Sequence, residues 1–255
     1  MKRTLLATLL FIAAGQANAL PIAYMSGASE PWGTSSNVDA MNGAFGVGNW
    51  DRVQFGAPFS GYDTLYVDGG ANNSDNFFSW VNTNRSALET FVMGGGELFL
   101  NAAGWSNDGV HSMLFGSMLT EAMFSLVGNA VDTGHAIFVG AGTSWSANSF
   151  SHDAVTGELT AMIAGQSGTI LAGAAFGEGY YMLGGQTSSS FHTGGNPLQL
   201  RINELLFVAA QGGNNANIQE STPSVPEPTS LALLGLGLAS LLLARRRRAI
   251  HTKLN

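Results

Sequence analysis

The densest group of oxygen-bearing side chains in the sequence lies in one short loop. Asp68, Asn72, Asn73 and Asp75 stand within eight residues, directly after an apolar stretch. Carboxylate and amide oxygens are the ligands that calcium prefers, and they also bind the hydroxyl groups of sugars. The spacing is not that of an EF-hand, and Asn, Asp and Gly are ordinary turn residues as well. The segment is therefore a candidate ligand loop with calcium as its candidate ion, and a plain turn is the simpler interpretation.

Residues that supply nucleophiles or metal ligands are otherwise sparse. The chain has no cysteine, which excludes a thiolate nucleophile and a thiolate zinc site. His111, His135, His152 and His192 are far apart, and none has the spacing of a helical zinc site. No G-x-S-x-G segment occurs, so the serine elbow of an α/β-hydrolase is missing. We predict no catalytic residue, no metal centre and no cofactor, apart from the calcium candidate.

Tryptophan is the other residue type with a chemistry of its own here. The five are Trp32, Trp50, Trp80, Trp105 and Trp145. Large aromatic rings are more often core or rim residues, but exposed ones can act as platforms on which sugar rings stack. The sequence does not say which of the five serve either role.

The two ends of the chain have the patterns of export and membrane insertion. Residues 1–19 combine a basic start, an apolar stretch and a small-x-small cleavage site at Ala17 and Ala19, as in a secretory signal peptide. At the other end, the apolar segment 229–244 is followed by four arginines. Such a basic cluster keeps its end of a span in the cytoplasm. The pattern predicts a transmembrane helix at 229–244, a cytoplasmic tail at 249–255 and a domain held outside.

A Pro-Glu-Pro triplet stands just before this apolar segment. The residues that make the C-terminal pattern are Val225, Pro226, Glu227, Pro228, Arg245, Arg246, Arg247 and Arg248. Together, residues 225–248 resemble the PEP-CTERM sorting signal of exopolysaccharide-producing Gram-negative bacteria. The resemblance implies processing by an exosortase, after cleavage of the signal peptide by a signal peptidase. An ordinary tail anchor with an accidental triplet is the alternative.

The same resemblance implies a location. The protein would first be anchored in the inner membrane by its C-terminal helix, facing the periplasm. After processing it would reach the cell surface or the extracellular matrix, with exopolysaccharide as a candidate partner. Residues 20–224 carry three basic and sixteen acidic side chains, a formal net charge of −13. This charge repels phosphates, so we expect no nucleic-acid partner.

Between the two ends, we predict one ectodomain at 20–211 and a polar linker at 212–224. Strands are expected at 21–25, 52–55, 63–68, 97–101 and 135–139, with a hairpin at 169–175 and 180–183. Helices are expected at 86–93 from a capping box at 86–89, at 112–127, and at 197–211 with Asn196 as its cap. The Gly-, Ser- and Asn-rich stretch 140–150 is expected to be a surface loop. Alternating strands and helices favour a three-layer α/β domain with a mainly parallel sheet.

The order of these elements resembles the class I glutamine amidotransferase-like fold, a flavodoxin-like architecture, including its trehalose-utilisation branch. The likeness rests on 62–67, 91–100, 177–185 and 201–206. In that family a cysteine nucleophile follows a strand, at a place that corresponds here to Asn101, Ala102, Ala103 and Gly104. The family's His-x-Glu pair falls nearest His192, where the acid is absent. The resemblance therefore implies the fold without glutamine hydrolysis.

Two functions are compatible with these residues. The one we favour is an exported, membrane-anchored or exosortase-processed protein of the cell surface or extracellular matrix, with a non-catalytic amidotransferase-like domain. The alternative is an extracellular hydrolase that acts on carbohydrate or peptide through carboxylates such as Asp68, Glu97 or Asp108. That reaction needs two carboxylates in one pocket, one of them with a raised pKa. Whether such carboxylates meet at the ends of the strands separates the two functions.

Overall fold

Side chains of the central strands alternate between two buried faces. The computed structural model describes residues 21–105 and 109–212, and its strand β3 (Thr64–Asp68) is buried over its whole length. Leu65 and Val67 pack into one apolar cluster, whereas Tyr66 packs into another. Because successive side chains of a strand point to opposite faces, the sheet has a core on each side. Helices are therefore needed on both faces to cover it.

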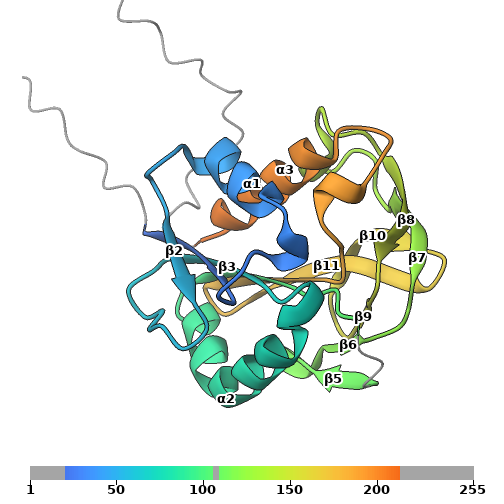
Figure 1. The fold of residues 1–255 in the computed structure, drawn as a ribbon. Coiled ribbons are helices and arrows are strands. Elements are labelled where there is room, and N and C mark those ends of the chain that lie inside the picture. Colours follow the sequence, from blue (N-terminus) through green and yellow to red (C-terminus); the bar gives the residue numbers. More distant parts are fainter. Residues whose placement is uncertain (1–20, 106–108, 213–255) are drawn as a thin grey trace, which may run out of the picture. The chain divides into compact units, whose positions relative to one another are not determined.

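The sheet combines a parallel half and an antiparallel half (Figure 1). In the parallel half the strand order is β2 (Asp51–Gln54), β1 (Ile22–Ser26), β3, β4 (Glu97–Asn101) and β12 (Gly179–Gly184). The antiparallel half continues through β11 (Gly168–Phe176), β10 (Thr160–Gly165), β7 (Ser125–Ala130) and β8 (Ser144–Ser151). The short strands beside it are β5 (Val110–Ser112), β6 (Met118–Thr120) and β9 (Ala154–Thr156). The pairing thus changes direction at β12.

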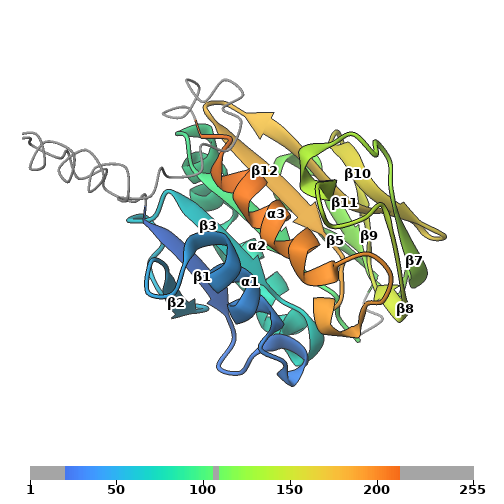
Figure 2. The same ribbon diagram turned by 90° about the horizontal axis from the view of Figure 1, so that it is seen from above.

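Helices cover both faces of the parallel half (Figures 1 and 2). On one face, α1 (Ser36–Phe45) and α3 (Pro197–Ala209) pack side by side and share an apolar cluster with Tyr66 and Phe99. On the other, α2 (Ser74–Met93) joins the cluster of Leu65 and Val67. The three layers of the predicted α/β domain are present. Within 21–105 and 109–212, no helix is long and apolar enough to cross a membrane, and the predicted span 229–244 and signal peptide 1–19 lie outside these residues.

Two local predictions are confirmed. Asn196 Oδ1 accepts a hydrogen bond from the main-chain N–H of Gln199 at 3.2 Å, so Asn196 caps α3, and Pro197 occupies its first turn. β11 and β12 form the predicted antiparallel hairpin. Both features depend on residues close together in the chain, which is why their sequence patterns were sufficient.

The predicted mainly parallel sheet is wrong for the half beyond β12. Residues 112–127, predicted as a helix, contribute to β5, β6 and β7 instead. Phe115, Gly116 and Ala122 have φ angles of 52°, 72° and 59°, which a right-handed helix excludes. A dense apolar run cannot be assigned to helix or strand by periodicity alone. Here it pairs with other strands in antiparallel fashion.

Two neighbouring segments differ from the structures predicted for them. The expected strand 135–139 contains a short 3₁₀ helix, Ala136–Phe138, because His135 Nδ1 accepts a hydrogen bond from the N–H of Ile137. The expected loop 140–150 contains most of β8, in which Trp145 and Phe150 are buried. Burial of these two aromatic rings outweighs the weak strand preference of their Ser and Asn neighbours.

The helix predicted to begin at residue 86 begins at Ser74. Ser86 lies inside α2, where its carbonyl accepts a hydrogen bond from Thr90 Oγ1 at 2.8 Å. Glu89 Oε1 accepts instead from the main-chain N–H of Phe115 at 3.0 Å. In the interior of a helix the N–H groups already bond to carbonyls one turn earlier, so the capping pattern has no free donors to satisfy.

Glu97, the first residue of β4, is a buried carboxyl group at the amino edge of the sheet. Thr64 Oγ1 donates a hydrogen bond to its Oε2 at 3.2 Å. Burial raises the pKa of Glu97 to about 7 in spite of this hydrogen bond, and the charge of Asp63 adds to the rise. The folded protein therefore keeps a proton at Glu97 that the unfolded chain releases near pH 4.5.

Glu97→Gln should flatten the dependence of stability on pH. Because the folded-state pKa is raised, the contribution of Glu97 is fully present below about pH 4.5 and is lost as the pH rises through about 7. Urea unfolding at several pH values should show the wild type losing free energy of unfolding relative to the variant across this window. Glu178→Gln, at an exposed site, is the matched control. Parallel curves for wild type and Glu97→Gln would contradict the assignment.

Gly179→Ala should destabilise the fold at the start of β12. A Cβ at Gly179 would lie 2.2 Å from the carbonyl oxygen of Gly96 and 2.3 Å from that of Val92, and backbone atoms cannot move away cheaply. We expect the free energy of unfolding to fall by about 1–3 kcal/mol, as for overpacked cores. Gly61→Ala, where no atom lies within 4 Å, should change it by less than about 0.5 kcal/mol. Equal urea midpoints for both variants would refute the close approach.

Candidate functional site

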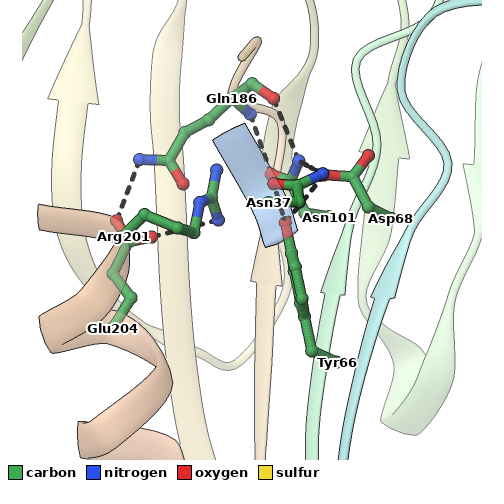
Figure 3. Close-up of polar contacts among 7 residues, drawn as sticks. All are labelled: Asn37, Tyr66, Asp68, Asn101, Gln186, Arg201 and Glu204. Carbon is green, nitrogen blue, oxygen red and sulfur yellow. Dashed lines mark hydrogen bonds and ion pairs between the residues drawn. The ribbon is translucent and has the colours of Figure 1, made fainter. Parts of the chain in front are cut away.

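The ends of three parallel strands bring polar side chains together (Figure 3). Asp68 ends β3, Asn101 ends β4, and Gln186 follows β12. Asn101 Nδ2 donates to Asp68 Oδ2 at 3.2 Å and to the carbonyl of Gln186 at 3.0 Å. Asn101 Oδ1 accepts from the main-chain N–H of Gln186 at 3.1 Å. One amide side chain thus joins three strand ends, at the edge where open α/β sheets bind their ligands.

Asp68, the first residue of the predicted ligand loop, is occupied by internal donors. Besides Asn101, its carboxylate accepts hydrogen bonds from Asn37 Nδ2 at 3.1 Å, the Tyr66 hydroxyl at 2.7 Å and the N–H of Gly70 at 2.7 Å. The residue is 3% exposed. Burial raises the pKa of Tyr66 well above its ordinary value, so the phenol remains a donor. Three of these donors meet Oδ2 and one meets Oδ1, so the fold itself holds the carboxylate in place.

α3 contributes a buried ion pair next to this carboxylate (Figure 3). Arg201 Nη1 lies 3.0 Å from Glu204 Oε2, and Gln186 Nε2 donates to Glu204 Oε1 at 3.0 Å. The Arg201 guanidinium also lies over the rings of Tyr66 and Phe99. The two opposite charges offset part of the cost of removing each other from water. We call these residues the edge network: Asn37, Tyr66, Asp68, Asn101, Gln186, Arg201 and Glu204.

The other residues of the predicted ligand loop point in different directions. Asn72 and Asp75 are exposed, whereas Asn73 is buried and its Nδ2 donates to the carbonyl of Ser29 at 3.2 Å. Asp75 lies in the first turn of α2, where a negative charge stabilises the helix. In the part of the chain that the structure describes, no three His, Asp or Glu side chains are grouped so that they could hold a metal ion. Calcium binding stays a prediction.

Small residues occupy the place at which the resemblance described in the sequence analysis implies a nucleophile. Ala102 and Ala103 are buried, and the chain proceeds from β4 to β5 rather than into a helix. His192 Nε2 lies 2.9 Å from Thr187 Oγ1, which also donates to the carbonyl of Ser149 at 2.8 Å. Burial lowers the pKa of His192 to about 3, so the ring is neutral. This pair lacks the acidic partner that orients a catalytic histidine.

A pair of carboxyl groups that sequence reasoning missed lies near the same edge. Asp153 is fully buried, and burial together with the charge of Glu121 raises its pKa to about 8. Glu121 Oε2 in turn lies 3.0 Å from His111 Nε2. A raised carboxyl pKa is a feature of catalytic acids, but a fully buried group does not reach a substrate. Nothing in the spacing of these residues along the chain indicated that they meet.

A pocket of about 580 Å³ opens at the carboxyl edge of the parallel half. Its aromatic wall consists of Trp32 after β1, Trp105 after β4 and Phe191 after β12, with His152 between them. Its polar wall comes from β8, with Ser146 and Asn148 among the lining residues. The volume is typical of sites for small molecules, ~300–1,000 Å³. We call this site the aromatic pocket.

The sequence predicted only some of the residues that line the aromatic pocket. Trp32 and Trp105 were two of five candidate platforms, and the signal that singles them out is that each follows the end of a parallel strand. Trp80 and Trp145, by contrast, are buried in the core. The polar wall was missed because the segment that forms β8 was predicted to be a loop. The predicted sorting and cleavage residues lie outside the described part of the chain.

Solved structures with folds similar to the described domain include amidotransferase-like proteins. A putative GMP synthase component from Thermoplasma acidophilum is 12% identical, with a TM-score of 0.48 over 75% of this chain and 94% of that one. A cytoplasmic protein from Salmonella typhimurium is 13% identical, with a TM-score of 0.46 over 74% and 99%. A putative ThuA-like protein from Parabacteroides merdae is 14% identical, with a TM-score of 0.43 over 79% and 92%. These likenesses concern the fold and not the activity.

No curated protein sequence matches the chain significantly. One family model does, and it matches residues 224–248, the segment with the Pro-Glu-Pro triplet, the apolar run and the arginines. That model describes the PEP-CTERM protein-sorting motif. The chain thus carries a PEP-CTERM protein-sorting motif at residues 224–248, C-terminal in sequence to the described α/β domain.

Proposed function

We propose that this protein is exported, is held in the inner membrane by its C-terminal segment, and is processed by an exosortase for delivery to the cell surface or extracellular matrix. A signal peptidase first removes residues 1–19, and the domain then faces the periplasm. The sorting motif at 224–248 supports this route, since such a motif implies an exosortase substrate. Exopolysaccharide is the proposed partner outside the cell. The domain has no cysteine, so it forms no disulfide bonds in that oxidising environment.

We infer further that the domain is a binding module and not an enzyme. The observation that supports this inference is the internal bonding of Asp68: the carboxylate at the end of β3 accepts four hydrogen bonds from within the fold. The neighbouring place of a nucleophile holds Ala102 and Ala103, which offer no reactive atom. The groups that could perform chemistry at this edge are thus used to hold the fold together.

The alternative, a carboxylate-dependent hydrolase, finds less support. Asp68 and Glu97 lie at opposite ends of parallel, neighbouring strands, so they do not share a pocket. Asp108, the third candidate, lies outside the described residues. Asp153 and Glu121 are close enough to affect each other, but Asp153 is fully buried. A glycosidase needs two carboxyl groups that both reach the substrate.

Sorting should depend on the Pro-Glu-Pro triplet. In cells that possess an exosortase, Pro226→Ala and Glu227→Ala should accumulate the full-length precursor, because the triplet stands just outside the predicted span, within reach of a membrane-embedded enzyme. Mass spectrometry of the membrane and secreted fractions measures this. Pro223→Ala, directly before the matched segment, is the control and should be processed normally. Identical mature masses for wild type and both triplet variants would count against the route.

Replacing Asp68 should weaken the fold. Asp68→Asn puts an amide NH₂ against donors that need an acceptor, so we expect the free energy of unfolding to fall by about 1–3 kcal/mol. Asp75→Asn, on the exposed side of α2, should change it by less than about 0.5 kcal/mol. Urea unfolding followed by tryptophan fluorescence measures both. A more stable Asp68→Asn variant would instead indicate a residue kept for function at the expense of stability.

The same two variants test the remaining calcium candidate. If the loop binds calcium, the ion raises the Tm of the wild type and not that of the variants. An unchanged wild-type Tm at millimolar calcium would remove the motivation for an ion at this loop.

A further inference from the structure

The aromatic pocket exposes large apolar rings that the fold does not need for its core. Trp105 is 64% exposed and Phe191 is 46% exposed, and both lie at the mouth of the same cavity. Exposed aromatic side chains gathered in a concave site mark a binding surface more often than a structural one. Together with Trp32 they bring aromatic rings from three separate loops to one cavity.

The rings are fixed in position by one another. The Trp32 ring meets Trp105 at 5.6 Å between centroids and 70°, Phe191 at 5.8 Å and 85°, and His152 at 5.1 Å and 89°. His152 Nδ1 is anchored on the carbonyl of Gly104 at 2.6 Å. Such edge-to-face contacts stabilise aromatic clusters. The platform is therefore in place before a ligand arrives, which reduces the entropy lost on binding.

Trp32, whose ring lies at the centre of these contacts, has a strained backbone conformation. Its φ of 63° lies in the left-handed region, which a bulky residue adopts at a cost of ~1–3 kcal/mol. Space for the indole depends on a missing side chain, since a Cβ at Gly70 would lie 2.6 Å from Trp32 Nε1. Strain of this kind persists where the surrounding structure enforces it, and it is concentrated at binding sites.

The opposite wall is polar and without formal charge. β8 and the residues that follow β12 supply hydroxyl and amide groups from Ser146, Asn148, Ser149 and Thr193. The described lining residues include no Asp, Glu, Lys or Arg. His152 is the one titratable side chain among them, and burial lowers its pKa, so the ring is neutral at neutral pH. The surrounding domain is strongly acidic, which disfavours an anionic ligand.

The described lining offers no counter-charge to an ionic ligand, and it matches a ligand with an apolar flat face on one side and several hydroxyl groups on the other. A sugar ring has this form: its C–H groups meet the negative face of an aromatic ring, and its hydroxyls both donate and accept hydrogen bonds. We propose that the aromatic pocket binds a neutral saccharide, stacked on Trp105 and Trp32 and hydrogen-bonded by the β8 wall. This inference deepens the proposed binding role of the domain and rests on it.

The test is calorimetric titration of the full-length chain, purified in a detergent without a sugar headgroup. Cellohexaose, maltohexaose and mannohexaose are the neutral probes, and hexagalacturonate is the charged probe of similar shape. At least one neutral probe should bind, and Trp105→Ala should weaken that binding about tenfold or more, as at other aromatic hot spots. Asn148→Ala should weaken it too. Trp105→Phe, which keeps an aromatic face, should retain most of the affinity.

Val139→Ala is the matched control, because Val139 is 73% exposed and does not line the pocket. Its affinity should equal that of the wild type, and the thermal unfolding of Trp105→Ala should stay close to that of the wild type because the ring is exposed. The proposal is overturned if no neutral probe binds, if Trp105→Ala binds as well as Val139→Ala, or if hexagalacturonate binds as tightly as the neutral probes.

Chromatography of the recovered sugar separates this proposal from the proposed function. Intact hexasaccharide after long incubation agrees with a binding module. Shortened products that Trp105→Ala does not form would leave the ligand class standing and would refute the non-catalytic role. Loss of all binding, with normal processing at the sorting motif, would refute the pocket alone.

Discussion

A buried negative charge at Asp68 organises the carboxyl edge of the sheet. A carboxylate removed from water must be surrounded by donors, and here they come from α1, β3, β4 and the turn after β3. Through Asn101 and Gln186 the hydrogen bonds continue to β12 and to the ion pair on α3. The polar side chains that join these elements are therefore engaged in hydrogen bonds with one another, and a catalytic site would need them free.

The change of direction at β12 shapes the site beside this network. β8, the last strand of the antiparallel half, contacts the chain that follows β12 through two isolated bridges, Ser146–Thr193 and Ser151–Gln186. Ser146 and Thr193 exchange main-chain hydrogen bonds at 2.8 and 2.7 Å, which hold β8 to the chain that follows β12. One wall of the aromatic pocket therefore belongs to the antiparallel half and the other to the parallel half.

The net charge of the domain differs from that of the pocket lining. Residues 20–224 carry a formal net charge of −13, while the described lining of the aromatic pocket has no formal charge. Glu97 and Asp153, whose carboxyl pKa values are raised to about 7 and about 8, are not among the residues that line the pocket. An acidic surface of this kind repels polyanions.

The sequence by itself determined the sorting motif and the features made by near neighbours in the chain. The pattern at 224–248 is linear, so the order of proline, apolar and arginine residues is sufficient to identify it. The cap at Asn196 involves a residue three positions away, and the β11–β12 hairpin joins adjacent strands, so local patterns were sufficient there too.

Only the tertiary structure decided what Asp68 does and where the pocket lies. The donors Asn37 and Asn101 are 31 and 33 residues from Asp68, and no local pattern announces them. Residues 112–127 had a plausible helical pattern, but positive φ angles and pairing with distant strands made them part of the sheet. Trp32 and Trp105 meet because parallel strands end at one edge. In each case burial against residues distant in the chain outweighs the local preference for helix, strand or turn. The sequence alone does not show which residues will be buried together.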